Sequence, residues 1–144
     1  MVDTNTHHAI DPEWVGTPRA LREGFAEVAL TTHARMAADA RGLVHGGFVF
    51  GLADYAAMLA VNDPYVVLGA AETRFTKPLV VGDVVVARAT RDIESGAGKK
   101  QVVKVTCTRG VETVFEGTFT CFVLPAHVLG PEPNASAETQ GDQP

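Results

Sequence analysis

The chain has 144 residues, of which 46% are hydrophobic and 20% charged, and its net charge is −5. This length is that of one domain able to bury a core of its own. The negative charge argues against a nucleic-acid-binding protein, because the cations form no basic stripe beyond Lys99, Lys100 and Lys104. These lysines fit the polar surface of a hairpin, or alternatively the phosphates of a ligand.

The two ends of the chain are expected to lie outside the folded domain. Residues 1–18 are polar, interrupted by proline, and without the basic start and apolar run of a secretory signal. Residues 125–144 offer little that a core could bury. We predict a flexible segment over 1–18, one domain over 19–124 and a disordered tail over 125–144. Since no segment is long and apolar enough to span a bilayer, we expect a cytoplasmic protein that does not bind membranes.

The secondary structure follows from apolar periodicity and from turn residues. Alternation over 24–32 predicts a first strand, and 33–45 predicts a loop. A continuous apolar stretch over 46–62 predicts a helix, which Asn62-Asp63-Pro64 ends. Four segments rich in β-branched residues follow, with turn residues between them: 66–77, 83–94, 100–109 and 111–124.

The last two of these segments alternate between apolar and polar residues. This pattern predicts an antiparallel sheet with one face in water. The dry face needs a cover, and the helix over 46–62 is the long apolar element available. The predicted fold is therefore α+β, a curved antiparallel sheet wrapped around one long central helix.

The two cysteines, Cys107 and Cys121, lie in these alternating segments. A turn at Arg109-Gly110 would place Cys107 opposite residues near 113 rather than opposite Cys121. The hairpin therefore predicts no disulfide between them. We expect two free thiols in the core, which agrees with a reducing compartment.

The predicted helix is apolar on every side and contains one carboxylate, Asp54. A helix that is hydrophobic all round is normally buried. An unpaired ionised carboxylate there is costly, unless burial raises its pKa and neutralises it. Asp54 is therefore the candidate catalytic group. The alternative is a buried carboxylate that backbone amides satisfy.

His45-Gly46-Gly47 opens this helix. The first N–H groups of a helix have no partners within it, and without side chains at the glycines a carbonyl oxygen can approach them closely. Alternatively, the glycines permit close helix packing. Gly47 and Asp54 are seven residues apart, so they face the same side roughly 10 Å from each other. One protomer cannot bring both to a single carbonyl, but Gly47 of one protomer and Asp54 of its partner can meet in a two-fold dimer.

The motif Gly-x-x-His-Gly-Gly over 42–47, with an Asp nine residues after the His, resembles the hotdog-fold acyl-CoA thioesterases of the phenylacetate-degradation type. The resemblance covers about residues 25–124 and continues in 74–83 and 114–119. It implies the hotdog fold, with Asp54 as nucleophile or general base and the partner's Gly47 amide polarising the thioester carbonyl. It also implies a homodimer or dimer of dimers that binds acyl-CoA, without a cofactor and without a metal.

Five further residues are candidates for substrate binding. His45 and Gly46 precede and begin the helix, although the His45 ring could instead bond to a backbone carbonyl. Asp39 stands six residues before the His, where many relatives have Asn. A second carboxylate close to Asp54 would raise the pKa of one of the pair; otherwise Asp39 is a solvated loop residue. Glu72 and Thr73 lie on the strand after the helix, where the pocket of a partner could be.

These observations together predict hydrolysis of an acyl-CoA thioester to the free acid and CoA. Either water attacks with Asp54 as general base, or Asp54 attacks and an anhydride is then hydrolysed. One alternative is non-catalytic acyl-CoA sensing. The part of the chain that forms the later strands, from 72–76 through 114–119, also resembles the hotdog domain of bacterial fatty-acid-synthesis repressors. Another is a hotdog hydratase or dehydratase with His45 as proton carrier. The sequence leaves open the acyl group and whether the carrier is CoA or acyl-carrier protein.

Overall fold

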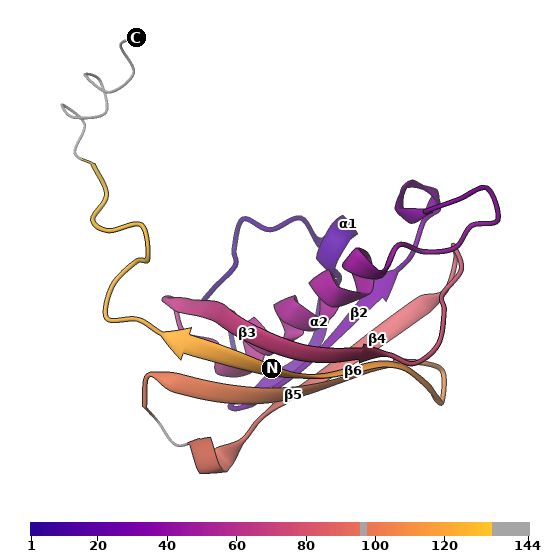
Figure 1. Ribbon diagram of the computed structural model, residues 1–144. Coiled ribbons are helices and arrows are strands. Elements are labelled where there is room, and N and C mark those ends of the chain that lie inside the picture. Colours follow the sequence, from indigo (N-terminus) through magenta and orange to yellow (C-terminus); the bar gives the residue numbers. More distant parts are fainter. Residues whose placement is uncertain (96–97, 134–144) are drawn as a thin grey trace, which may run out of the picture.

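One sheet of six strands and one long helix make up most of the protein, which a computed structural model describes over residues 1–95 and 98–133 (Figure 1). The elements in chain order are α1 (Pro12–Val15), β1 (Thr17–Arg22), β2 (Phe25–Thr31), η1 (Ala34–Met36), α2 (Gly46–Val61), β3 (Val66–Phe75), β4 (Val84–Arg91), η2 (Ile93–Ser95), β5 (Lys100–Arg109) and β6 (Glu112–Val123). The strands lie in the order β1-β2-β4-β5-β6-β3, and each neighbouring pair is antiparallel. The predicted α+β class with an antiparallel sheet is thus confirmed.

The inner face of the sheet forms the core together with α2. Buried and exposed residues alternate along β4 and β5, as expected of strands with one wet face. Helix α2 contacts all six strands through this face. The four strands predicted after the helix are β3 to β6, with ends up to three residues shorter than expected.

Helix α2 begins and ends close to where the sequence predicts. His45, just before it, is extended, and the helix then runs from Gly46 to Val61. Asn62 ends it in the left-handed conformation at φ 56°, and its N–H donates to the Met58 carbonyl. Among the described residues, none of the helices combines the length and apolar character that a bilayer crossing requires.

The N-terminal residues differ from the flexible segment predicted over 1–18. Helix α1 and the start of β1 lie within this range, and β1 was not predicted. Thr6 is buried, and the Asn5 amide donates to the Asn62 side chain at the end of α2 over 2.7 Å. These contacts join polar residues far apart in sequence, so apolar periodicity could not predict them. Of the tail predicted over 125–144, residues 134–144 lie outside the described part of the chain.

Both cysteines are buried and free, as predicted. Cys107 pairs with Phe115, two residues beyond the expected position, because the turn lies one residue later, at 110–111, and a bulge at Cys107/Thr108 shifts the register of the β5–β6 hairpin by one more. Burial raises the pKa of each thiol to about 12. Neither cysteine is therefore a reactive thiolate near neutral pH.

Candidate active site

Gly47, Phe50 and Asp54 lie on one side of α2, because residues separated by three, four or seven positions share a helix face. The Phe50 ring contacts Phe119 of β6, with ring centroids 5.6 Å apart. This side of the helix therefore faces β6, whose other neighbour besides β5 is the edge strand β3. The candidate carboxylate lies near an edge of the sheet.

Asp54 has the properties of a reactive carboxyl. Its Oδ1 atom is buried and has no hydrogen-bond partner among the described residues. Burial raises the pKa of Asp54 to about 6. The backbone amides that would satisfy a purely structural carboxylate do not reach this oxygen within one protomer. The group can therefore exchange a proton close to neutral pH.

The two glycines at the start of α2 have different surroundings. A Cβ at Gly46 would meet the Phe75 ring at 3.1 Å, so close packing accounts for the glycine there. A Cβ at Gly47 would meet only the ring of its neighbour His45, also at 3.1 Å. Gly47 is exposed, and among the described residues a Cβ there would meet no other side chain or distant backbone within 4 Å. Its amide remains accessible to a ligand or to a second protomer.

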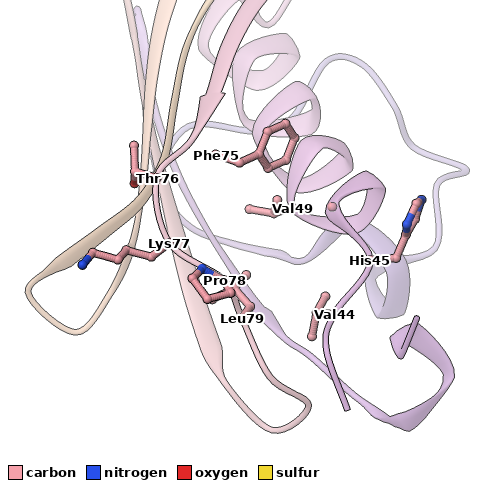
Figure 2. Close-up of a pocket in the computed structure, with 9 residues that line it drawn as sticks. Val44, His45, Val49, Phe75, Thr76, Lys77, Pro78 and Leu79 are labelled. Carbon is pink, nitrogen blue, oxygen red and sulfur yellow. The ribbon is translucent and has the colours of Figure 1, made fainter. Parts of the chain in front are cut away.

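A hollow of about 380 Å³ lies between the start of α2 and the β3–β4 connection (Figure 2). Most of the side chains that line it are apolar. The lining residues are Val44, His45, Gly46, Val49, Phe75, Thr76, Lys77, Pro78 and Leu79. In Figure 2 the His45 ring points away from Phe75 and Val49. Asp54 does not line the hollow, so one protomer does not bring the carboxylate and the hollow together.

The β3–β4 connection that borders the hollow is fixed by Arg109. Its guanidinium donates to the Pro78 carbonyl over 3.0 Å and to the Asp83 carboxylate over 2.9 Å, and it also pairs with Glu112. The Val80 N–H donates to the same Asp83 carboxylate over 2.9 Å. The pKa of Asp83 is lowered, chiefly by the Val80 N–H and further by Arg109, while burial opposes the change.

We expect Asp83→Asn to lower the free energy of unfolding by about 1 kcal/mol at about pH 7, because the hydrogen bonds from the Val80 N–H and from Arg109 are no longer made to a charged group. The pKa of Asp83 is lower in the folded state, so its contribution is full above the ordinary pKa of about 3.9 and disappears as the pH falls through the lowered value. Urea unfolding of both proteins at several pH values measures this difference. A difference that does not shrink below about pH 4 would contradict the assignment.

Strand β3 places the candidates Glu72 and Thr73 on opposite sides of the sheet. The Phe75 ring packs on Phe115, with centroids 5.1 Å apart, on the side of α2. Thr73, two residues earlier and paired with Gly117, shares that side. Glu72 faces outward and is exposed. The structure thus groups Thr73 with the helix start, but not Glu72, and both remain predictions as substrate-binding residues.

Asp39 is exposed and is bonded within its own loop. Its carboxylate accepts hydrogen bonds from the Arg41 N–H over 2.9 Å and the Leu43 N–H over 3.2 Å. These bonds hold the turn around Gly42, whose φ is 80°. The arrangement favours the solvated loop residue over a partner for Asp54.

We expect Asp39→Asn to leave unchanged the pH dependence of the hydrolysis that the sequence predicts, because the Asn oxygen can accept the same two N–H groups. Asp39→Ala should instead destabilise the loop by about 1 kcal/mol, since both bonds are lost. Initial rates of hydrolysis along the acidic side of the pH–rate profile, its acid limb, show the first effect, and urea unfolding shows the second. An acid limb that moves to lower pH in Asp39→Asn would show that this carboxylate lies close to Asp54 after all.

Two features of the site were not singled out from the sequence. The first is Phe75, which fills the space beside Gly46 and lies in the segment 74–83 that carries the family resemblance. The second is the edge position of β3. Strand order depends on contacts between distant segments, so alternation along β3 itself gave no signal for it.

Solved structures assign the class of protein. PH1136 from Pyrococcus horikoshii, an uncharacterised protein, is 54% identical with a TM-score of 0.86, over 90% of this chain and 98% of that one. A mutant of the phenylacetic acid degradation protein PaaI from Thermus thermophilus is 30% identical with a TM-score of 0.70, over 78% of this chain and 97% of that one. PaaI proteins have the hotdog fold, and the sheet with its single long helix places this protein in the same class. The chain belongs to the PaaI family.

Two curated relatives match over only part of their length. Methylthioribose-1-phosphate isomerase from Aquifex aeolicus is 48% identical over 124 residues, which are 85% of this chain but 27% of the isomerase. Transcription factor FapR from Bacillus cereus is 32% identical over 81 residues, which are 56% of this chain and 41% of FapR. The chain thus spans about a quarter of the first relative and two fifths of the second. No family model matches the chain.

Proposed function

We propose that the protein hydrolyses an acyl-CoA thioester to the free acid and CoA, with Asp54 as general base or nucleophile. The observation behind this proposal is the buried Asp54 Oδ1, which has no hydrogen-bond partner among the described residues. With a pKa of about 6 the group is mostly ionised at neutral pH, yet it is a stronger base than an ordinary carboxylate. The thioesterase-type fold of the PaaI relatives supports the same reaction.

The proposal requires a second copy of the chain. Gly47 and Asp54 are roughly 10 Å apart along one helix, too far for one carbonyl group to contact both. Strand β3 is an edge of ten residues, mostly exposed, and an unpaired edge of this length is open to pairing with another chain. If two β3 strands pair about a two-fold axis, the Asp54 side of each α2 approaches the partner. The partner's Gly47 amide then faces Asp54.

In the proposed reaction the partner's Gly47 N–H donates to the thioester carbonyl oxygen and stabilises the negative charge that develops there. With Asp54 as general base, the carboxylate takes a proton from water while the water oxygen attacks the carbonyl carbon. The C–S bond then breaks, and the thiolate of CoA takes up the proton. With Asp54 as nucleophile, its carboxylate oxygen attacks the carbonyl carbon and the C–S bond breaks, which releases the thiolate of CoA. Water then hydrolyses the acyl-Asp54 anhydride to the free acid and the Asp54 carboxylate, and the thiolate takes up the proton.

The remaining candidates have places in this proposal. The apolar hollow beside His45 and Gly46 would receive the acyl group, and Thr73 lies on the same side of β3. The proposal also keeps the curved sheet wrapped around α2, which the contacts of α2 with all six strands support. The functional unit is a homodimer or a dimer of dimers.

A second candidate function is acyl-CoA binding without hydrolysis. The match of 81 residues to the transcription factor FapR favours it, although that match is shorter than the one to PaaI. Asp54 distinguishes the two functions, because a sensor needs no buried base. A hydratase or dehydratase has no such support, since His45 and Asp54 lie on different turns of α2.

The experiment is a panel of aromatic, short, medium and long acyl-CoAs, read by release of free thiol and, in parallel, by calorimetric binding. Turnover with kcat/KM of about 10⁴ M⁻¹s⁻¹ or more for one class supports the thioesterase. Binding without thiol release supports the sensor. Neither binding nor release across the panel would contradict both proposals.

A further inference from the structure

We propose that Cys121 is a positioning residue for Asp54: the Cys121 side chain forms an apolar wall on the sheet side of the carboxyl group and offers it no strong hydrogen bond. The inference deepens the proposed function and rests on it for its kinetic consequence. The wall itself is a property of the folded chain and can be tested without any substrate.

The packing of α2 on β6 places the two side chains together. Gly46 lies against Phe75, which pairs with Phe115 near the start of β6, so α2 and β6 run in the same direction. Further along, Phe50 contacts Phe119. Asp54 lies one helical turn beyond Phe50 on the same side of α2, and Cys121 lies two residues beyond Phe119 on the same face of β6, so both side chains follow this contact in the same direction.

An electrostatic effect also places Asp54 close to Cys121. The pKa of the Cys121 thiol is raised first by burial and then by the negative charge of Asp54. Cys107, equally buried on β5, has its pKa raised by burial alone. Since such an effect falls with distance, it places the Asp54 carboxylate nearer Cys121 than Cys107.

The other titratable groups on elements packed against α2 face elsewhere. Tyr55 faces the His7 ring, 6.1 Å away, on the side covered by the N-terminal segment. Cys107 lies at the level of the helix start, and Glu13 of α1 pairs with an arginine of η1. The residues of β1, β2 and β4 buried towards α2 are Ala, Val and Leu, and those of β3 on this side are not ionisable. Among the described residues, the β6 thiol is thus the titratable group from another element that faces Asp54.

The chemistry of a thiol explains the wall. A buried S–H is a weak donor and behaves as a small apolar group, so it gives little stabilisation to a neighbouring carboxylate. A hydroxyl in the same place would donate a strong hydrogen bond and favour the ionised form. The identity of residue 121 therefore sets how readily Asp54 takes up a proton.

The test follows the Asp54 carboxyl carbon by ¹³C NMR during a pH titration, with the signal assigned by its absence in Asp54→Asn. Cys121→Ser should move the midpoint down by about 0.5–1 pH unit, whereas the apolar Cys121→Val should leave it raised. Cys107→Ser is the matched control, since it makes the same change at an equally buried site on the next strand. If Cys121→Ser does not fold, Cys121→Thr, which has the shape of Val, should give the same downward shift.

An unchanged midpoint in both hydroxyl variants, or an equal shift in Cys107→Ser, would overturn the inference. The acid limb of thioester hydrolysis should follow the NMR midpoint in each variant. If no thioester is hydrolysed at any pH, the proposed function fails, but the titration still decides whether Cys121 controls Asp54.

Discussion

Asp54→Asn is expected to preserve the fold and to reduce thioester hydrolysis by about 100-fold or more, the usual effect of removing a general base or a nucleophile. The Asn side chain has the same shape, but it cannot take a proton from water. The variant should also be more stable than the wild type at neutral pH. The pKa of Asp54 is raised in the folded protein, so burying the ionised form opposes folding above about pH 6, and Asn removes this cost.

Thiol release and urea unfolding measured on the same samples test both effects. Asp83→Asn is the matched control, because it makes the same substitution at a carboxylate in the β3–β4 connection. That control should lose stability and keep hydrolysis, the opposite of the result at Asp54. In the wild type the rate should rise with pH through a midpoint near 6, where Asp54 ionises. Wild-type turnover by folded Asp54→Asn would remove Asp54 from the mechanism.

The sequence predicted the elements of this fold well, because its strongest signals are local. The apolar stretch with one carboxylate gave α2 and Asp54, and the alternation of β5 gave the face that α2 covers. It could not give the order of the strands. The edge position of β3 depends on pairing with β6 rather than with its neighbour in sequence, β4.

The roles of single residues were predicted less well than the elements. Glu72 and Thr73 looked alike in the sequence, but a bulge at Leu68/Ala70 sets the register of β3 and so decides which of them faces α2. Asp39 looked like a second acid near the site, yet its oxygen is bonded by the amides of its own loop. In both cases the deciding contact is a local backbone geometry that residue types do not reveal.

The difference between Gly46 and Gly47 has the same origin and points to the dimer. Both glycines have the same sequence signal, but Gly46 makes room for the Phe75 ring, whereas a Cβ at Gly47 would meet only the His45 ring in the part of the chain that the structure describes. A glycine without a packing role at an exposed helix start is a position where a ligand can approach. Since Asp54 of the same helix lies too far away, the proposed partner for the Gly47 amide is the Asp54 of a second protomer.

Subunit exchange tests this arrangement directly. We expect Gly47→Pro to abolish hydrolysis, because proline has no N–H, although the first turn of a helix tolerates proline. Gly47→Ala adds a similar crowding beside His45 but keeps the N–H, so it should remain active. Mixing the inactive Gly47→Pro and Asp54→Asn proteins should restore about a quarter of the wild-type activity, since random exchange makes half the dimers mixed and each mixed dimer has one intact site of two.

The restored fraction is informative because the two defects are on the same helix. If each site used Gly47 and Asp54 of one protomer, every site in a mixed dimer would still contain one defect, and mixing would restore nothing. Differently tagged protomers, purified in tandem after exchange, show that mixed dimers have formed. Mixed dimers without activity would therefore mean that the catalytic site lies within a single protomer, and that the exposed β3 edge has another role.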